Sequence, residues 1–549
     1  MLRRVYAARG ISSPDDLDLG LSGLLPVGTL DGVDAAVDLL ADALARERRV
    51  IVVGDFDADG ATSCALLVRG LARLGLRDVG YLVPDRFRFG YGLTPEIVAL
   101  AAERAPGLIV TVDNGISSDA GVAAARALGI DVLITDHHLP GATLPAANAI
   151  CNPNLAGAAF ASKSLAGVGV AFYVLAALSR CLAGSGATRA VPSAADLLDL
   201  VALGTVADVV PLDRNNRILV AQGLKRIRAG SCVPGISALL AEGGRRPERV
   251  VAADLGFAVG PRLNAAGRLD DMSLGIECLL TDDPARARLL AAELGRLNAE
   301  RRVIEGRMND EAAAIVSRMH LDEQELPLGL CLYDESWHHG VVGLVAARVK
   351  ERLHRPVVAL APADRDWLRG SARSVPGVHM RDALDAVAKR RAGVLERFGG
   401  HAMAAGLTLH RERLEEFREL FVEEIARRME PADAEGVVLS DGELRPGEMT
   451  LATALALRAG GPWGQGFPEP LFDGRFTILE SRIVGERHLK MRVRMDGDTP
   501  AYDAIAFNVG ADGSTAIPRG KGSVQLAYRL DVNEYQGLER LQLVVEHLC

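Results

Sequence analysis

The sequence predicts an α/β protein: a mostly parallel sheet domain joined by a long helix to a second α/β domain, followed by a C-terminal OB-type β-barrel. Strand-like and helix-like segments alternate through residues 33–138, which is typical of βαβ units. One helical pattern continues over about residues 283–320, and after residue 438 short runs alternate with turns. The chain has 549 residues, more than one hydrophobic core usually serves, so several domains are expected.

The first region alternates between two hydrophobic periodicities. Strands are expected at 49–54, 79–83, 108–112 and 131–135. Helices are expected at 35–44, 61–74, 94–105 and 117–128. Thr94 and Pro95 suit the N-cap and first helical position, and Ser117 or Ser118 is expected to cap the next helix. Segments of these lengths predict a parallel sheet covered by helices.

The long helical pattern predicts a connection between two domains. An unbroken helix from Asp283 to His320 would be about 57 Å long at 1.5 Å per residue. A break near Asn298, giving two helices, is the alternative. The expected apolar stripe consists of Leu290, Leu294, Leu297, Ile304 and Met308. The predicted domains are a catalytic domain at 1–285, the linking helix at 286–320, a second α/β domain at 321–430 and the barrel at 438–549.

Beyond the helix the pattern first returns to α/β and then becomes all-β. In the second α/β domain, strands are expected at 328–333 and 357–360 and helices at 341–353 and 414–428. Residues 431–436 suit a linker. Short strands are expected at 475–480, 489–495, 502–508, 523–530 and 540–546. Five short strands with few helices suggest a small barrel, of which the OB-fold is one candidate.

Composition excludes several classes of protein. The net charge of −9 excludes a globally basic nucleic-acid binder but not a local basic groove. None of the seven cysteines forms a C-x-x-C pair, so a zinc ribbon is not expected. No run of 18 apolar residues and no secretory signal is found, so we expect no membrane span and a cytoplasmic location.

Acidic and imidazole side chains follow three of the expected strands. In chain order they are Asp55, Asp57 and Asp59, then Asp113, then Asp136, His137 and His138. Because the carboxyl ends of parallel strands face one crevice, these groups should converge. Taken singly, each has a structural explanation: helix N-terminal acids, an Asp-Asn-Gly turn, or structural histidines. Their common placement at strand ends favours a functional site.

The converging carboxylates predict a metal centre, because they would repel one another unless a cation neutralised them. Mixed Asp and His ligands fit Mn²⁺, and Mg²⁺ more weakly. Two such ions about 3.5–4 Å apart would activate a water for attack on phosphorus. Residues 54–60 do not spell a dinucleotide fingerprint, and no P-loop motif occurs.

The motifs Asp57-x-Asp59, Asp113, Asp136-His137-His138 and Gly204–Pro211 resemble those of the DHH phosphoesterase superfamily. The resemblance adds Asp208, which spacing alone does not reveal. It implies that two Mn²⁺ or Mg²⁺ ions are held by Asp57, Asp59, Asp113, His137 and Asp208. Asp55, Asp136 and His138 would lie among or beside these ligands.

Longer motifs resemble the bacterial members of that superfamily that degrade single-stranded DNA from the 5′ end. They include residues 85–92, 260–268, 337–343, 370–374, 399–406 and 462–470. The resemblance implies phosphate or substrate contacts by Arg86, Arg262, Asn264, Arg268, Ser371, Arg373, Gly399, Gly400 and His401. His401 would also face the metals as a catalytic group. The segment before Val50 is short for this branch.

The barrel favours a polymeric substrate. Its expected cations are Arg482, Arg487, Lys490, Arg492, Arg494 and Arg529, and the aromatic residues that could stack on bases, or fill the barrel core instead, are Phe507, Tyr528 and Tyr535. The expected activity is a single-strand-specific 5′→3′ exonuclease releasing 5′-mononucleotides in DNA repair and recombination. The alternatives are a phosphodiesterase for short oligonucleotides or cyclic dinucleotides, and a non-catalytic scaffold. The resemblance suggests a monomer with a single-strand-binding protein and a RecQ-type helicase as partners.

Overall fold

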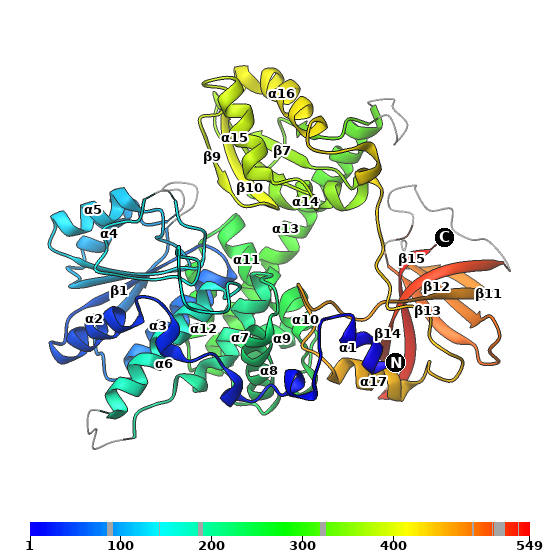
Figure 1. The fold of residues 1–549 in the computed structure, drawn as a ribbon, viewed down its shortest axis with the longest axis horizontal. Coiled ribbons are helices and arrows are strands. Elements are labelled where there is room, and N and C mark those ends of the chain that lie inside the picture. Colours follow the sequence, from blue (N-terminus) through cyan, green and yellow to red (C-terminus); the bar gives the residue numbers. More distant parts are fainter. Residues whose placement is uncertain are drawn as a thin grey trace. The chain divides into compact units, whose positions relative to one another are not determined.

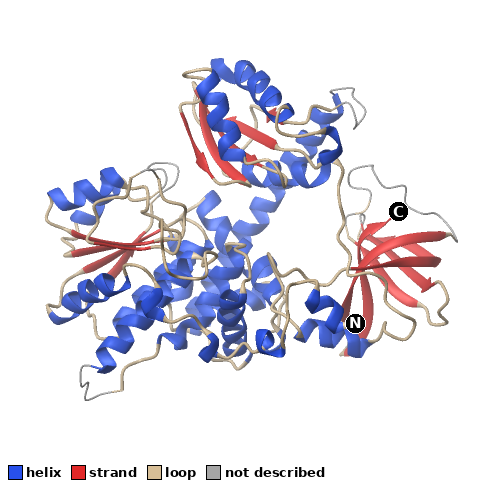
Figure 2. Ribbon diagram, in the orientation of Figure 1, coloured by secondary structure: helices blue, strands red, loops and turns tan. Residues whose placement is uncertain are grey.

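The computed structural model describes residues 1–84, 92–141, 143–184, 190–318, 326–485, 488–507, 509, 522–535 and 537–548. It divides into two compact units, which are described separately below. The first unit contains Met1–Asn298 and Ser440–Cys549, and the second contains Ala299–Leu439. Figure 1 traces the chain through both, and Figure 2 shows where helices and strands occur.

The first unit is built on a five-stranded parallel sheet of order β2-β1-β3-β4-β5. Its strands are β1 (Val50–Gly54), β2 (Val79–Leu82), β3 (Leu108–Val112), β4 (Asp131–Thr135) and β5 (Ala149–Cys151). Every residue of β1 and β3 is buried, as expected for central strands covered on both faces. The four predicted strands are confirmed, and β5 is an addition.

Helices cover both faces of this sheet. Two apolar cores lie on its two sides: α2 (Val33–Ala45) and α3 (Ala58–Arg73) contribute to one, and α4 (Pro95–Ala102) and α5 (Asp119–Ala127) to the other. Thr94 caps α4 as predicted, accepting a hydrogen bond from the backbone N–H of Ile97. Ser118 occupies the N-cap position of α5, one of the two predicted, but its hydroxyl makes no capping hydrogen bond and accepts instead from the backbone N–H of Leu93.

A helical layer that the sequence patterns did not predict follows the sheet. Its main helices are α6 (Gly167–Gly184), α7 (Leu198–Ala207), α8 (Arg214–Arg228), α9 (Pro234–Glu242), α11 (Gly260–Leu269) and α12 (Ser273–Leu280). Among the described residues, α6 is the one helix that is long and apolar enough to cross a membrane by length and composition alone. Most of α6 is buried inside the unit, where it packs on α2, α3 and α7.

The long helix is confirmed as α13 (Pro284–Arg318), a single element of 35 residues without a break near Asn298. Leu290, Leu294, Leu297 and Met308 of the predicted stripe are buried, and Ile304 is half-buried. The division into two compact units falls within α13. The finer domain limits proposed from the sequence remain predictions.

The second unit contains a five-stranded mixed sheet of order β6-β7-β8-β10-β9. The strands are β6 (Leu330–Tyr333), β7 (Val357–Pro362), β8 (Trp367–Arg373), β9 (Arg397–Gly400) and β10 (Ala404–His410). Helices α14 (Val342–Leu353), α15 (Met380–Arg390) and α16 (Leu414–Ala426) accompany it. Only β6 and β7 pair in parallel, so this sheet is less regular than that of the first unit.

The C-terminal strands form the predicted closed barrel, of order β11-β12-β13-β15-β14. The strands are β11 (Phe472–Val484), β12 (His488–Met495), β13 (Tyr502–Ala506), β14 (Ser523–Tyr535) and β15 (Leu538–Leu548). β11 and β14 each have 13 residues, which is longer than expected. The N-terminal helix α1 (Leu2–Ala7) places Val5 in the barrel core. A buried ion pair joins Arg9 to Asp441 at 2.7 Å.

Candidate metal centre

The loop from β1 to α3 orients two of the predicted metal ligands. Asp57 is the N-cap of α3, and its Oδ1 accepts from the backbone N–H groups of Asp59 and Gly60 at 2.9 and 3.0 Å. Asp59 lies in the first turn and is 1% exposed. The buried α3 thus presents both carboxylates at the carboxyl end of β1, where a helix N-terminus favours negative charge.

The N-terminus of α6 holds Asp59 from the other side. The backbone N–H of Gly167 donates to Asp59 Oδ2 at 2.6 Å, and that of Val168 donates to Oδ1 at 2.9 Å. A Cβ at Gly167 would lie 2.6 Å from the Cβ of Asp113, so only glycine permits this approach. Asp113 follows β3 with a left-handed φ of 60°, a conformation that is uncommon for non-glycine residues but that Asp adopts more readily than most.

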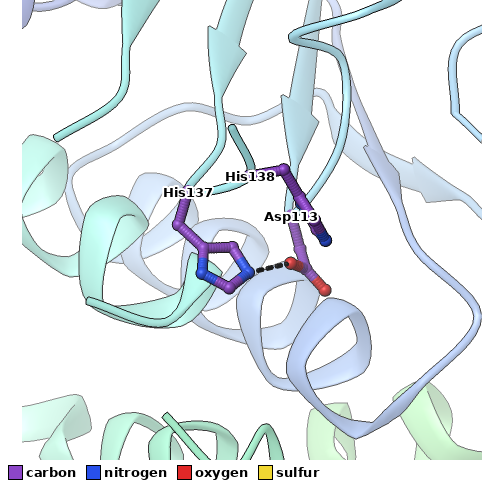
Figure 3. Close-up of side chains that lie close together, drawn as sticks. All are labelled: Asp113, His137 and His138. Carbon is purple, nitrogen blue, oxygen red and sulfur yellow. Dashed lines mark ion pairs between the residues drawn. The ribbon is translucent and has the colours of Figure 1, made fainter. Parts of the chain in front are cut away.

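The segment after β4 brings two imidazoles to the same place. His137 Nε2 lies 3.0 Å from Asp113 Oδ1, and Figure 3 shows His137, His138 and Asp113 close together. Asp136 is 1% exposed, and most of its hydrogen bonds are to the two histidines that follow it. Its Oδ1 accepts from the backbone N–H groups of His137 and His138 and lies 2.7 Å from His138 Nδ1, while its Oδ2 accepts from the backbone N–H of Ile116. Asp136 therefore orients both histidines.

Asp208 completes the cluster from the end of α7. Its Oδ2 is buried, accepts no hydrogen bond from the described residues and lies 3.6 Å from His137 Nε2. The next residue, Val209, is a β-branched residue with φ 61°, so the chain is strained where it leaves the cluster. Among the described residues, three groups have ligand atoms within 4.8 Å of one another: Asp113-His137-His138, Asp59-His137-Asp208 and Asp55-Asp57-Asp113.

Crowding and burial perturb these carboxyl groups. Burial and the charge of Asp208 raise the pKa of Asp59 to about 7. Burial and the charge of Asp57 raise the pKa of Asp208 to about 8. Burial and neighbouring carboxylates also raise the pKa of Asp113 well above its usual value. Such mutual repulsion is what a divalent cation relieves.

The two histidines differ in protonation. Burial and the charge of His138 lower the pKa of His137, so its imidazole is neutral near pH 7, as metal ligation requires. Burial, the largest single influence, would lower the pKa of His138, but the hydrogen bond with Asp136 and the charges of Asp136, Asp55 and Asp208 together outweigh it and raise the pKa to about 9. His138 is therefore cationic at neutral pH in the metal-free protein. The donor set of carboxylates and a neutral imidazole, with the buried Asp208 oxygen, fits Mn²⁺ or Mg²⁺.

Helix α11 carries three residues predicted to contact substrate. Arg262 donates to the backbone oxygens of Ala258 and Glu242, and Arg268 is half-buried in the last turn. Asn264 Oδ1 accepts from the backbone N–H of Ala58 at 2.8 Å, which places it beside the metal loop. Substrate contacts for these three residues remain predictions. Arg86 lies outside the described residues.

The remaining predicted substrate residues lie in the second unit. Arg373 is half-buried at the end of β8 and donates to the hydroxyl of Ser371 and the backbone oxygen of Ala372, each at 2.8 Å. Burial lowers the pKa of Arg373, and no described carboxylate pairs with it. Strand β10 separates β8 from β9, with Gly406 opposite both Ser371 and Gly399. Gly400 ends β9 and His401 follows it, exposed.

The barrel exposes some of the residues predicted to bind nucleic acid and buries others. Alternation along β12 places Lys490, Arg492 and Arg494 outward, while Leu489, Met491 and Val493 fill the core. Arg482 is exposed and pairs in register with Lys490, and Phe507 is 53% exposed. Tyr528 is fully buried, so of its two expected roles it fills the barrel core. The expectation for Arg529 is wrong, because its charge is held by Glu469 and Glu546. Arg487 and the Tyr535 side chain lie outside the described residues.

Sequence reasoning missed the backbone groups that hold the cluster. The N–H groups of Gly167, Val168 and Ile116 fix Asp59 and Asp136. The segment Gly167-Val168-Gly169 at the start of an apolar run was the one available signal, since glycine there suggests a close approach. Ile116 left no signal, because any non-proline residue supplies an N–H.

The parallel sheet with its carboxylate–histidine cluster defines a phosphoesterase of the DHH class. Three family models match the chain: "DHH family, N-terminal domain" at residues 49–205, "DHHA1 domain" at 315–427 and "RecJ OB domain" at 440–547. The single-stranded-DNA-specific exonuclease RecJ of Dickeya dadantii is 56% identical, and the match covers 100% of this chain and 96% of that protein. The chain therefore belongs to the RecJ family of exonucleases.

Solved structures agree over the whole chain. The crystal structure of RecJ in complex with Mn²⁺ from Thermus thermophilus is 34% identical, with a TM-score of 0.81, and the match covers 100% of this chain and 75% of that one. The corresponding complex with Mg²⁺ is 32% identical, with a TM-score of 0.76, and covers 99% and 74%. Both metals predicted from the donor set occur in these relatives.

Proposed function

We propose that this chain is a single-stranded-DNA-specific 5′→3′ exonuclease that releases 5′-mononucleotides by metal-dependent hydrolysis. The observation that carries the proposal is the convergence of buried carboxylates and His137 from the ends of β1, β3, β4 and α7. Membership of the RecJ family supports the substrate class. The polarity and the product rest on the motif resemblance.

The proposed metal ligands are Asp57, Asp59, Asp113, His137 and Asp208, holding two Mn²⁺ or Mg²⁺ ions, with Asp55 beside them. Divalent ions held there would supply Lewis-acid chemistry, polarising the phosphodiester and activating a water for attack. The chain's own contribution is to keep these ligands rigid. The α6 amides fix Asp59, and the two histidines are fixed through Asp136.

His138 is the group best suited to act on substrate directly. In the metal-free protein it is cationic at neutral pH, because the hydrogen bond with Asp136 and the neighbouring carboxylates raise its pKa to about 9, and its side chain is 30% exposed. We assign it the role of donating a hydrogen bond or a proton to a phosphate oxygen. Asp136 would then be a positioning residue, since its oxygens accept hydrogen bonds from the protein.

The second unit offers a phosphate site in this proposal. A guanidinium without a carboxylate partner among the described residues is suited to an anion, and Arg373 has this property beside the Ser371 hydroxyl. Gly399, Gly400 and His401 lie two strands away in the same sheet. We assign substrate binding to the residues of the second unit just named and to Arg86, Arg262 and Arg268 of the first. We also assign a catalytic role to His401.

The barrel accounts for the preference for a polymer. The outward cations of β12, with Arg482 opposite Lys490, form a row suited to a phosphate backbone, and exposed Phe507 could stack on a base. A single-strand-binding protein and a RecQ-type helicase are proposed partners on the grounds of the family resemblance. We further propose a monomer working in the cytoplasm in DNA repair and recombination.

Timed digestion of labelled strands with Mn²⁺ tests the proposal. A 5′-labelled single strand should release labelled mononucleotide at once, whereas a 3′-labelled strand should release its label only at the end. Release of the 3′ label first would overturn the polarity. Equal rates on single-stranded and blunt double-stranded DNA would overturn the strand preference. Removing residues 440–549 should abolish long-strand digestion but spare dinucleotide hydrolysis if the barrel selects the polymer.

A further inference from the structure

Helix α11 touches the metal-binding loop through two residues one turn apart. Asn264 Oδ1 accepts the backbone N–H of Ala58 at 2.8 Å. Three residues on, Gly267 packs so closely that a Cβ there would lie 1.8 Å from the backbone oxygen of Phe56. Residues three apart share one face of a helix, so both contacts come from the same side of α11.

The hydrogen bond from Ala58 to Asn264 helps to satisfy the backbone N–H groups at the N-terminus of α3. The first N–H groups of a helix have no partner within the helix. Asp57 Oδ1 satisfies those of Asp59 and Gly60, and Asn264 satisfies that of Ala58, the first residue of α3. Ala58 is 1% exposed, so water cannot easily replace this hydrogen bond. Ala58 stands between Asp57 and Asp59, so its position determines how the two carboxylates are spaced.

We propose that Asn264 is a positioning residue of the metal centre, which fixes the loop of Asp57 and Asp59 before a metal binds, with Gly267 allowing α11 to approach. The inference rests on the proposed role of these two aspartates as metal ligands. It gives Asn264 a role different from the substrate contact that its motif suggests. Loss of a group that orients metal ligands typically weakens metal binding by about 10–100-fold.

Titration of the full-length protein with Mn²⁺, followed by electron paramagnetic resonance of the free ion, measures this effect without any substrate. Asn264→Leu removes the acceptor at similar volume and should weaken Mn²⁺ binding by about 10–100-fold. Asn264→Ala, which adds no apolar bulk, should do the same. Asn264→Asp keeps an oxygen that can accept the Ala58 N–H, so its Mn²⁺ affinity should stay near that of the wild type.

Two matched controls separate positioning from general stability. Asn148 Oδ1 accepts the backbone N–H of Val132 at 2.9 Å, at the far end of β4 from the metal centre, so Asn148→Leu loses the same kind of bond. A Cβ at Gly235 would lie 2.0 Å from the backbone oxygen of Cys278, so Gly235→Ala creates the same kind of clash as Gly267→Ala. The controls should keep wild-type Mn²⁺ affinity, whereas Gly267→Ala should lose it.

The outcomes are distinct. Wild-type Mn²⁺ affinity in Asn264→Leu, with a raised KM for DNA, would overturn the inference and favour a substrate contact. An equal loss of affinity in Asn148→Leu would also overturn it, because the effect would then be general. Absence of Mn²⁺ binding by the wild type would overturn the metal assignment and the inference with it.

Discussion

The candidate metal centre of the first unit and the candidate phosphate site at Arg373 in the second unit differ in the sign of their charge. In the metal centre, several carboxylates converge, and burial with mutual repulsion raises the pKa values of Asp59, Asp113 and Asp208. At the other site a half-buried guanidinium has hydroxyl and carbonyl oxygens as its partners. Uncompensated buried charge costs stability. Each site is therefore suited to a ligand of opposite charge: a cation in one and a phosphate in the other.

The largest expected effect is the loss of catalysis on removing one carboxylate from the metal centre. Asp113→Ala should lower the rate of single-strand digestion by at least about 10³-fold, equivalent to ~4 kcal/mol, because Asp113 belongs to two of the three candidate ligand groups. Initial rates on a 5′-labelled strand measure it. Asp119→Asn, at an exposed position in the first turn of α5, is the control and should keep full activity. Activity in Asp113→Ala within tenfold of the wild type would remove Asp113 from the site.

The Arg373 site should show a smaller effect, mainly on substrate binding. Arg373→Met should raise KM for single-stranded DNA by about 10–100-fold, since one charge-assisted contact to phosphate is worth roughly 1.5–3 kcal/mol. Its melting temperature should stay equal or rise, because a half-buried charge that has no carboxylate partner among the described residues is removed. Arg365→Met, at an exposed loop position, is the control. An unchanged KM would show that Arg373 does not bind a phosphate group of the substrate.

Metal binding should depend on pH, because Mn²⁺ needs ionised carboxylates. In the metal-free protein the pKa of Asp59 is about 7 and that of Asp208 about 8, so protons compete with the metal below these values. Mn²⁺ affinity should therefore rise by about tenfold per pH unit for each displaced proton between pH 6 and 8. Calorimetry in two buffers of different ionisation enthalpy counts the protons released. Constant affinity over this range would contradict the raised pKa values.

The smallest expected effect is on the stability of the metal-free protein. The pKa of Asp208 is higher in the folded than in the unfolded chain, so its ionisation destabilises the fold increasingly as pH rises from about 4 to 8. Asp208→Asn removes that charge and should raise the free energy of unfolding at pH 8 by about 1–3 kcal/mol, and by less at pH 5. Urea unfolding with a chelator present measures it. A destabilised variant at pH 8 would show that Asp208 is not repelled by its neighbours.

Much of the metal centre was predictable because it depends on local sequence. Apolar runs identified β1, β3 and β4, and the acids and histidines directly after them had to meet at one edge of a parallel sheet. Asp208 was different. It ends α7, about 70 residues beyond His137, and nothing in its own spacing predicts that α7 reaches the sheet, so motif resemblance was needed.

The helical layer, the caps and the barrel interior were less predictable. Ser118 suited a helix cap, yet its hydroxyl accepts from Leu93, which precedes α4. Tyr528 and Arg529 are neighbours on β14 and point to opposite sides of the strand. Tyr528 therefore lies in the barrel core, whereas Arg529 pairs with Glu469 and Glu546. A shift of one residue in register would reverse that assignment, and sequence patterns define strand boundaries less sharply than this.

The sequence by itself determined which residue types end the central strands, and so the class of chemistry, because side-chain identity and strand position are local properties. Only the tertiary structure decided how these groups are held. The amides of Gly167 and Val168 on Asp59, and the contact of Asn264 with Ala58, join segments about 100 and 200 residues apart. Such contacts follow from helix packing, which positions backbone groups that are chemically the same in almost every residue.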